Sequence, residues 1–334
     1  MNQIIRVNNL TKTYKNFKRR EGVKGALYNL FKREYKDVYA VSNISFTINQ
    51  GEMVGYIGPN GAGKSTTIKM LTGILRPTSG EVNVSGVCPH KDRLRHTQNI
   101  GVVFGQRTQL WWDIAVIEAF SLLKKIYGIS ENDYTNRLKR FSVAMEIEGL
   151  LHTPVRKLSL GERMKCDLIA SLLHNPPVVF LDEPTIGLDV AVKMTVRHLI
   201  KKINAEEKTT IILATHDLKD IEAICQRVII IDQGRILYDG GVESIKKNIG
   251  RQRKLILYFN KLPTLAEMKT KTGEDHIQLS LKEQRLEITF DRTKKTAAAL
   301  IGCVMSHFDV RDLEIREPEL ADIVKGIYEG KYAL

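Results

Sequence analysis

Residues 53–67 read Met-Val-Gly-Tyr-Ile-Gly-Pro-Asn-Gly-Ala-Gly-Lys-Ser-Thr-Thr, and this stretch decides the fold. Met53 to Ile57 is apolar on both faces and stops at Gly58-Pro59, which predicts a short buried strand. Gly58 to Ser65 fits the spacing G-x-x-x-x-G-K-[ST], and Thr66 to Leu71 is expected to open a helix. Gly-rich turns also occur as ordinary connections, but the full spacing between a strand and a helix favours a loop that binds nucleotide phosphates.

The residue types of this loop fit phosphate and magnesium chemistry. Glycines allow backbone N–H groups to converge on phosphate oxygens, and the N-terminus of the next helix faces the same oxygens. We expect Lys64 to reach the β- and γ-phosphates and the Ser65 hydroxyl to bind Mg²⁺. The residues expected to contact the nucleotide here are Gly58, Pro59, Asn60, Gly61, Ala62, Gly63, Lys64, Ser65 and Thr66.

The bulk composition indicates an ordinary globular protein with an excess of positive charge. The chain has 334 residues, 43% hydrophobic and 27% charged, and this length suits one large domain and one small domain. No apolar run approaches the roughly 20 residues that span a bilayer, and the first residues do not resemble a signal peptide. The four cysteines lack metal-ligand or paired spacing, so we expect reduced thiols. The formal charge of +13 suits nucleic acid, an anionic membrane surface, or a nucleotide-binding chain with solvated lysines.

The N-terminal part of the chain predicts two strands separated by an insertion. The strands are expected at residues 4–8 and about 39–48, and the insertion covers 15–38 with an excess of Lys and Arg. Apolar residues recur at helical spacing within the insertion, with basic residues on the other faces. Two interpretations stay open: a basic amphipathic helix that touches a membrane surface or membrane partner, or a helix packed on its own domain.

The rest of the chain predicts a parallel α/β sheet and a small second domain. A mostly helical stretch is expected over about 113–175, followed by strands at 178–182, 209–214 and 228–232 that alternate with helices. Such alternation is typical of a mainly parallel sheet. Beyond residue 247 the pattern changes to strands at 254–259, 285–290 and 310–315 with helices at 293–307 and 319–328. This part predicts an α+β accessory domain over 248–334.

Three further residues carry the expected chemistry. An apolar strand ends at Asp182 and Glu183, and His216 follows another strand, so all three are expected at the same edge of the sheet. Asp182 is placed to hold Mg²⁺, and Glu183 to orient and polarise an attacking water. The plainer reading is a pair of ordinary acids at a strand end and a structural histidine.

The order of these motifs resembles that of the ATP-binding-cassette (ABC) ATPases over residues 1 to about 245. In sequence order the motifs are GPNGAGKST at 58–66, Gln106 in VVFGQ, LSLGER at 158–163, LDEPTIGLD at 181–189 and His216 in ATHD. The resemblance implies a P-loop NTPase with a RecA-like core, an antiparallel β subdomain and a helical signature subdomain at about 113–175. It assigns residues 1–247 to the ATPase domain.

The resemblance also implies roles for individual residues. Glu183 is the catalytic base, His216 the switch histidine, and Gln106 completes the shell of Mg²⁺ and water. Ser159 and Gly161 contact the γ-phosphate bound to an opposite subunit, and Asp189 lies in the loop that crosses the dimer interface. Tyr14 matches the aromatic residue that stacks on adenine, with Tyr39 as the competitor. ATP and Mg²⁺ are the implied cofactors, and two cassettes close head-to-tail around two ATP molecules.

Two features depart from the common pattern of the family. The signature usually reads Leu-Ser-Gly-Gly-Gln, whereas this chain has Leu158-Ser-Leu-Gly-Glu-Arg, which retains Ser159 and Gly161. Leu160 and Glu162 are therefore expected to affect dimer closure. The second departure is the insertion at 15–38, which resembles insertions in ATPases that serve ABC-2 type permeases.

The C-terminal sequence refines the expected class of transporter. Residues 312–324, with Glu317-Pro-Glu-Leu, resemble the tail that follows the cassette in bacterial ABC-2 exporter ATPases. Trp111 and Trp112 follow the glutamine loop, where cassettes receive a helix of the permease, so they either form that apolar socket or pack in the core. The expected function is the ATPase subunit of an ABC-2 exporter, peripheral on the cytoplasmic face of the cell membrane.

An alternative is a soluble cassette ATPase that acts on nucleic acid or ribosomes, which the positive charge would suit. The single phosphate loop and the lack of sustained heptads disfavour it, so no nucleic-acid partner is expected. The expected partners are ABC-2 permease subunits and a second cassette. Two intact halves of the site favour a homodimer, with a heterodimer left open. The transported substrate is not indicated by these residues.

Overall fold

The computed structural model describes residues 2–17, 35–105, 107–248, 252–272, 277–282 and 285–331. The chain divides into two compact units, Met1–Asp239 and Gly240–Leu334. Most of the expected insertion helix, residues 18–34, and Gln106 lie outside the described residues. None of the described helices is long and apolar enough to cross a membrane.

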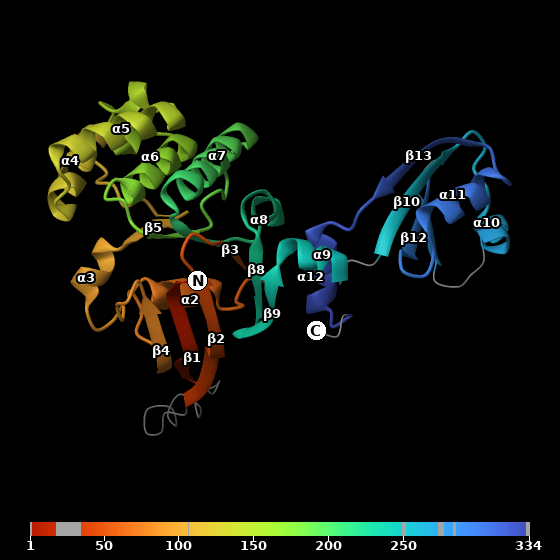
Figure 1. The fold of residues 1–334 in the computed structure, drawn as a ribbon, viewed down its shortest axis with the longest axis horizontal. Coiled ribbons are helices and arrows are strands. Elements are labelled where there is room, and N and C mark those ends of the chain that lie inside the picture. The colour runs from red at the N-terminus through yellow and green to blue at the C-terminus, as the bar shows by residue number, and fades with distance from the viewer. Residues whose placement is uncertain are drawn as a thin grey trace, which may run out of the picture. The chain divides into compact units, whose positions relative to one another are not determined.

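The first unit is built on a six-stranded sheet in the order β5-β6-β7-β3-β8-β9. Strands β5, β3, β8 and β9 of this sheet are labelled in Figure 1. Its strands are β5 (Ile100–Phe104), β6 (Val178–Asp182), β7 (Thr210–Ala214), β3 (Met53–Ile57), β8 (Arg227–Asp232) and β9 (Arg235–Gly241). The pairs β5–β6, β6–β7, β7–β3 and β3–β8 are parallel. Every residue of β3, β6 and β7 is buried, as expected for central strands covered on both faces.

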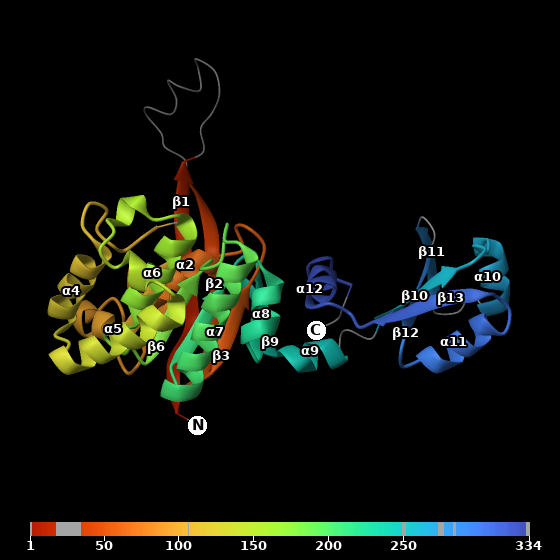
Figure 2. The same cartoon turned by 90° about the horizontal axis from the view of Figure 1, so that it is seen from above.

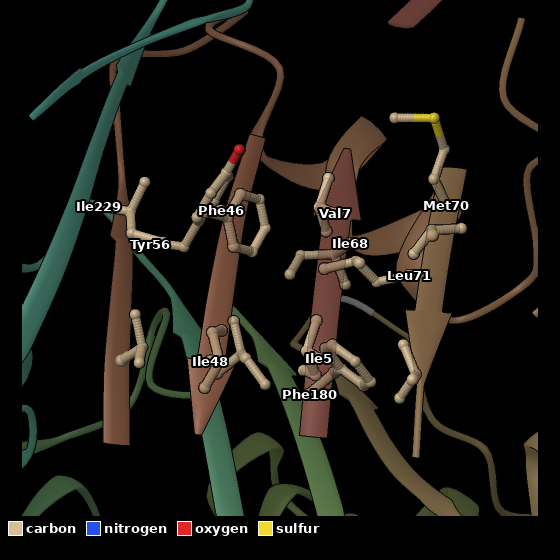
Figure 3. Close-up of a cluster of buried hydrophobic side chains, with 14 of the residues drawn as sticks. Ile5, Val7, Phe46, Ile48, Tyr56, Ile68, Met70, Leu71, Phe180 and Ile229 are labelled. Carbon is tan, nitrogen blue, oxygen red and sulfur yellow. The ribbon is translucent and has the colours of Figure 1, made fainter. Parts of the chain in front are cut away.

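A second, antiparallel sheet has the order β2-β1-β4 and consists of β1 (Gln3–Phe17), β2 (Tyr35–Asn49) and β4 (Ser79–Val84). The inner face of this sheet packs with helix α2 (Lys64–Leu71) and with residues of β3, β6 and β8 in one apolar cluster (Figure 3). Large side chains such as Ile5, Ile68 and Phe180 are fully buried there. Each such burial contributes about 1.5–3 kcal/mol, so this cluster fixes α2 beneath the phosphate loop.

The strands β1 and β2 continue into the segment where the sequence predicts an insertion helix. Their pairing runs to Lys15–Asp37, Asn16–Lys36 and Phe17–Tyr35. The ends of the 15–38 insertion are therefore strand. The predicted apolar helical positions at 23–31 lie outside the described residues.

Helices fill the remainder of the first unit. The predicted helical stretch contains α4 (Val116–Tyr127), α5 (Glu131–Met145) and α6 (Leu160–Leu172), with short 3₁₀ turns at Glu148–Leu150 and Val155–Lys157. These three α-helices gather on one side of the unit in both views (Figures 1 and 2). The other helices of this unit are α3 (Arg93–Gln98), α7 (Val190–Glu207) and α8 (Leu218–Ile224). The expected α/β architecture with an antiparallel and a helical subdomain is confirmed.

The second unit has its own four-stranded antiparallel sheet in the order β11-β12-β10-β13. The strands are β10 (Gln252–Phe259), β11 (Ile277–Lys282), β12 (Arg285–Asp291) and β13 (Val310–Arg316). Helices α10 (Leu265–Thr272) and α11 (Ala297–Met305) cover its apolar face around Leu257, Ile288 and Val304. Helices α9 (Val242–Asn248) and α12 (Leu320–Tyr328) belong to the same unit. The unit is of the α+β class, with β11 and α10 in addition to the elements that the sequence indicates.

Candidate functional site

The phosphate loop connects the buried strand β3 to helix α2, as the sequence predicts. Gly63 adopts φ 106°, and a Cβ atom at this position would lie 2.4 Å from the carbonyl oxygen of Ala40. The backbone N–H of Gly234 donates to the Ala62 carbonyl at 3.0 Å, and the N–H of Ser42 donates to the Gly234 carbonyl at 2.8 Å. The loop is therefore held between β2 and the turn before β9, and only glycine fits at residue 63.

Lys64 points into the loop that it terminates. Its Nζ donates to the carbonyl of Gly58 at 2.6 Å and to that of Pro59 at 3.2 Å, and the residue is 7% exposed. Burial lowers the pKa of this amine, while Glu183 and Asp182 act in the opposite direction. A desolvated ammonium enclosed by a glycine-rich loop is suited to phosphate oxygens.

Ser65 and Asp182 meet where the chemistry requires a cation site. The Ser65 hydroxyl donates to Oδ1 of Asp182 over 3.4 Å, although the two residues are distant in sequence. Asp182 ends β6 and is 8% exposed, and burial raises the pKa of its carboxyl. A hydroxyl and a carboxylate are hard oxygen ligands, and a divalent cation would offset the cost of burying the charge. The residues present therefore fit Mg²⁺.

Glu183 is held in a conformation that is unusual for a residue with a side chain. Its φ is 56°, in the left-handed region, which costs about 1–3 kcal/mol. Its N–H donates to the Ala214 carbonyl at 2.8 Å, so strand β7 fixes the turn. The surroundings thus impose a strained backbone on the residue that directly follows β6.

Two residues after β7 bind the Glu183 carboxylate. Nδ1 of His216 lies 2.8 Å from it, and the Thr215 hydroxyl donates to it over 3.3 Å. His216 is thus brought to Glu183, as expected from strand order. Thr215 was not predicted as a site residue, although its position directly before His216 in the sequence indicated that it would lie near the site. The pair Glu183–His216 is the candidate apparatus for orienting a nucleophilic water.

The signature residues lie at the start of helix α6. Ser159 is the N-cap, and its Oγ accepts from the N–H of Glu162 at 3.3 Å. Gly161 faces helix α7, because a Cβ atom there would lie 3.2 Å from Cγ2 of Val192. Asp189 caps α7 and accepts from the N–H of Val192 at 2.9 Å. Among the described residues, the hydrogen bonds of Ser159 and Asp189 are local, and neither reaches the phosphate loop of the same chain.

The pairing of β1 with β2 bears on the two candidate adenine residues. Tyr14 pairs with Val38 and Thr13 with Tyr39, so the two tyrosines project to opposite faces of the ribbon. Lys12 pairs with Val41, and the Lys12 ammonium lies 5.4 Å from the centre of the Tyr14 ring, which places Lys12 and Tyr14 on one face. Both tyrosines remain exposed.

The residues that follow Gln106 in the sequence donate hydrogen bonds to a buried carboxylate. Oδ1 of Asp167 accepts from the Thr108 hydroxyl at 2.9 Å and from the Gln109 N–H at 3.0 Å. Burial raises the pKa of Asp167 to about 6. Sequence reasoning missed this residue because it sits within the apolar pattern of a helix. It holds the segment directly after Gln106, which itself lies outside the described residues.

The two tryptophans are not core residues. Trp111 is 43% exposed and Trp112 is 49% exposed, and the guanidinium of Arg163 lies 5.3 Å from the Trp112 ring centre. The core-packing interpretation is therefore wrong. Two adjacent exposed aromatic side chains are typical of a surface that contacts a partner.

Comparison with known proteins agrees with this geometry. Residues 41–186 match the family model described as ABC transporter. The chain is 32% identical over 232 residues to the ABC transporter ATP-binding protein NatA of Bacillus subtilis, covering 70% of this chain and 94% of the relative. It is 28% identical over 295 residues to the linearmycin resistance ATP-binding protein LnrL of the same organism, covering 86% of this chain and 93% of LnrL.

Other relatives are much longer, and the chain covers 13% of mouse ATP-binding cassette sub-family A member 6. A solved structure of an ATP-binding cassette dimer, bound to ADP and Pi after hydrolysis, is similar with a TM-score of 0.59 and 26% identity. That match covers 71% of this chain and 98% of the solved chain. A family relative matched over nearly its whole length, together with the shared cassette fold, identifies the class. The chain belongs to the ATP-binding proteins of ABC transporters.

Proposed function

We propose that this chain hydrolyses ATP as the motor subunit of an ABC-2 type exporter, bound to a separately encoded permease at the cytoplasmic face of the membrane. The single observation that carries the ATPase part is the convergence of Lys64, Asp182 and Glu183 at the ends of β3 and β6. Family membership implies ATP binding and hydrolysis. The exporter part rests on the sequence that follows the cassette and on the named relatives.

The residues of one chain would divide the chemistry between binding and activation of water. Lys64 and the loop N–H groups bind the β- and γ-phosphates, while Ser65 and Asp182 hold Mg²⁺, with Gln106 as a further expected ligand. When bound, Mg²⁺ neutralises charge that develops on the transferred phosphoryl group. Glu183 accepts the proton of the attacking water, and His216 holds the Glu183 carboxylate in place and contacts the γ-phosphate.

Each chain would provide two separate halves of a site. The local hydrogen bonds of Ser159 and Asp189 leave the phosphate loop without signature residues from its own chain. We infer that Ser159 and Gly161 act on ATP bound to a second cassette, with Asp189 near the interface between the two. The structural neighbour described as dimeric supports this arrangement, and two copies of this chain would satisfy it.

Two candidates are kept for the residue that stacks on adenine, Tyr14 and Tyr39. The side chain of Val41 approaches Gly63 of the phosphate loop, within 3.3 Å of a Cβ atom built there. Val41 pairs with Lys12, whose ammonium lies over the Tyr14 ring, while Tyr39 lies two positions before Val41 in β2 and the register shifts between Lys12 and Thr13. The strand pairing therefore favours neither tyrosine over the other.

The surface after Gln106 is the proposed contact with the permease. Trp111 and Trp112 are half-exposed and adjacent to a segment anchored on Asp167. The match to LnrL, at 295 residues, is longer than the unit Met1–Asp239, so it includes part of the second unit. LnrL is named for linearmycin resistance, which supports export as the direction of transport. The alternative role on nucleic acid or ribosomes has only the net charge in its favour.

The Glu183→Gln substitution tests the ATPase assignment. Removing the base should lower steady-state ATP hydrolysis by about 100-fold or more while ATP still binds, because Lys64 and the loop are unchanged. Phosphate release and binding of a fluorescent ATP analogue measure the two effects. The exposed Glu148→Gln serves as the matched control and should retain activity. Undiminished hydrolysis by the Glu183→Gln variant would remove Glu183 from this role.

Co-purification tests the exporter assignment. The protein, produced together with the products of its neighbouring genes, should be retained by a tagged membrane permease in detergent. Replacing Trp111 and Trp112 by Ala should reduce this retention without lowering ATP binding. A chain that never associates with a permease under these conditions would contradict the proposal.

A further inference from the structure

The Ser159 hydroxyl donates its only proton in a hydrogen bond to the Glu162 carboxylate. Oγ of Ser159 accepts from the N–H of Glu162 at 3.3 Å and donates to Oε2 of Glu162 at 2.8 Å. The same Oε2 also accepts from the N–H of Ser159 at 2.8 Å. A serine hydroxyl has a single proton, so in this state it has none to offer a phosphate oxygen.

Glu162 is an ionised carboxylate in this arrangement. The N–H and hydroxyl of Ser159 lower the pKa of Glu162, with Lys165 acting in the same direction and burial opposing it. The two nearby cations of α6 have other contacts, since Lys165 lies 3.8 Å from Glu146 and Arg163 lies over Trp112. Among the ion pairs between described residues, none includes Glu162.

We propose that Glu162 is a positioning residue that opposes ATP-dependent closure of two cassettes by holding the Ser159 hydroxyl and by placing a negative charge beside the incoming γ-phosphate. This inference rests on the proposed function, in which Ser159 of one cassette meets ATP bound to another. Closure must break the bond from Ser159 to Glu162 before the hydroxyl can donate to the phosphate. The carboxylate then remains next to a like charge.

The second unit contains a copy of the same cap, outside the part of the chain that carries the phosphate-loop motif. At the start of α10, the N–H of Thr264 donates to Oε2 of Glu267 at 2.8 Å, and its hydroxyl donates to the same oxygen at 2.9 Å. The N–H of Glu267 donates to the Thr264 hydroxyl oxygen at 3.3 Å. The geometry of the two caps is thus matched, and Glu267 provides an internal control.

The experiment compares ATP-driven dimerisation of three full-length proteins that all carry Glu183→Gln to prevent hydrolysis. They are this parent, the parent with Glu162→Gln and the parent with Glu267→Gln. A glutamine amide oxygen still accepts the N–H of the N-cap residue, so the helix cap is kept while the charge is removed. Sedimentation velocity with ATP and Mg²⁺ gives the dimer dissociation constant of each.

Glu162→Gln should lower the dimer dissociation constant by about tenfold per site, hence about 100-fold for a dimer with two sites. It should also reduce the dependence of that constant on salt, because a like-charge contact has been removed. Glu267→Gln should match the parent. ATP affinity of the monomer should be the same in all three proteins, since Glu162 does not touch its own phosphate loop.

Equal or weaker dimerisation of the Glu162→Gln protein, with monomer ATP affinity and thermal stability unchanged, would overturn the inference and leave the proposed function standing. A stronger dimer in the Glu267→Gln protein as well would also overturn it, because a general charge effect would then suffice. A parent that binds ATP but never dimerises would refute the two-cassette site itself, and the role of Glu162 with it.

Discussion

Gly105 is the residue on which the position of Glu183 depends most closely. A Cβ atom at Gly105 would lie 1.9 Å from the carbonyl oxygen of Glu183, and the Gly105 N–H donates to the Asp182 carbonyl at 2.8 Å. The strained turn at Glu183 thus requires a residue without a side chain opposite it. Neither the left-handed backbone of Glu183 nor this contact is visible in the sequence, which predicts only that the two carboxylates end a strand.

Gly105→Ala should lower the turnover number by more than about tenfold, because the backbone of Glu183 must move and its carboxylate with it. ATP affinity should change little, since the phosphate loop lies on another strand. Phosphate release and nucleotide binding distinguish the two effects. Gly149→Ala is the matched control, because nothing lies within 4 Å of a Cβ atom built there. Equal losses in both variants would contradict the proposed contact.

Asp167 gives a pH dependence whose sign follows from its burial. Its pKa is raised to about 6 from 3.8, so the folded chain keeps a proton that the unfolded chain has released between these values. Stability from this group is therefore present at low pH and is lost as pH rises from about 4 to about 6. Asp167→Asn, which retains an oxygen acceptor, should remove this fall. Urea unfolding of both proteins at pH 4.5 and 7 measures the difference, and an unchanged difference between the two pH values would exclude Asp167 as its source.

Elements in the centre of the first unit follow from sequence patterns, whereas those at its edges do not. Strand β3 occupies the predicted residues 53–57, because a buried central strand is apolar throughout. Strands β1 and β2 extend beyond the predicted ranges, since pairs such as Lys15–Asp37 are polar and carry no alternation. In the second unit, β11 has the alternating sequence Ile-Gln-Leu-Ser-Leu-Lys, so its signal was present although it was not predicted.

Helices α7 and α8 are joined to the loop after Glu183 by one buried carboxylate. Asp220 is fully buried, accepts from Nε of Arg197 at 2.6 Å and also accepts from the Thr185 hydroxyl. Three elements that are distant in sequence meet at this residue. The alternation of strands and helices in the sequence predicts α7 and α8, but it cannot predict a polar network between them.

Asp220→Ala should lower the free energy of unfolding by about 3 kcal/mol, because it leaves Arg197 and Thr185 without their buried acceptor. It should also lower ATP turnover, since the loop that contains Thr185 begins at Glu183. Glu206→Gln removes an ion pair at the surface, 3.7 Å from Arg140, and should cost less than about 1 kcal/mol. Urea denaturation compares the two variants. A similar small loss in both would show that the Asp220 network contributes no more than a surface pair.

At the scale of the whole molecule, the two units have separate cores, and the phosphate-loop motif lies in the first unit. The first core surrounds α2 and both sheets of Met1–Asp239, whereas the second surrounds Leu257 and Ile288 of Gly240–Leu334. A composition change near residue 248 predicted this division, and the unit in the structure begins at Gly240. The domain boundary expected at 247/248 stays a prediction.

Heating the full chain should therefore give two unfolding transitions, of which ATP with Mg²⁺ raises only one. At a ligand concentration of about 100 times the dissociation constant, binding stabilises the first unit by about 2.7 kcal/mol. The second unit holds no phosphate loop and should unfold at the same temperature with or without ATP. Differential scanning calorimetry, with the Glu183→Gln protein to prevent turnover, measures both transitions. Lys64→Ala should abolish the ATP-dependent shift while leaving the second transition in place. One single transition that moves as a whole with ATP would mean that the two units unfold together.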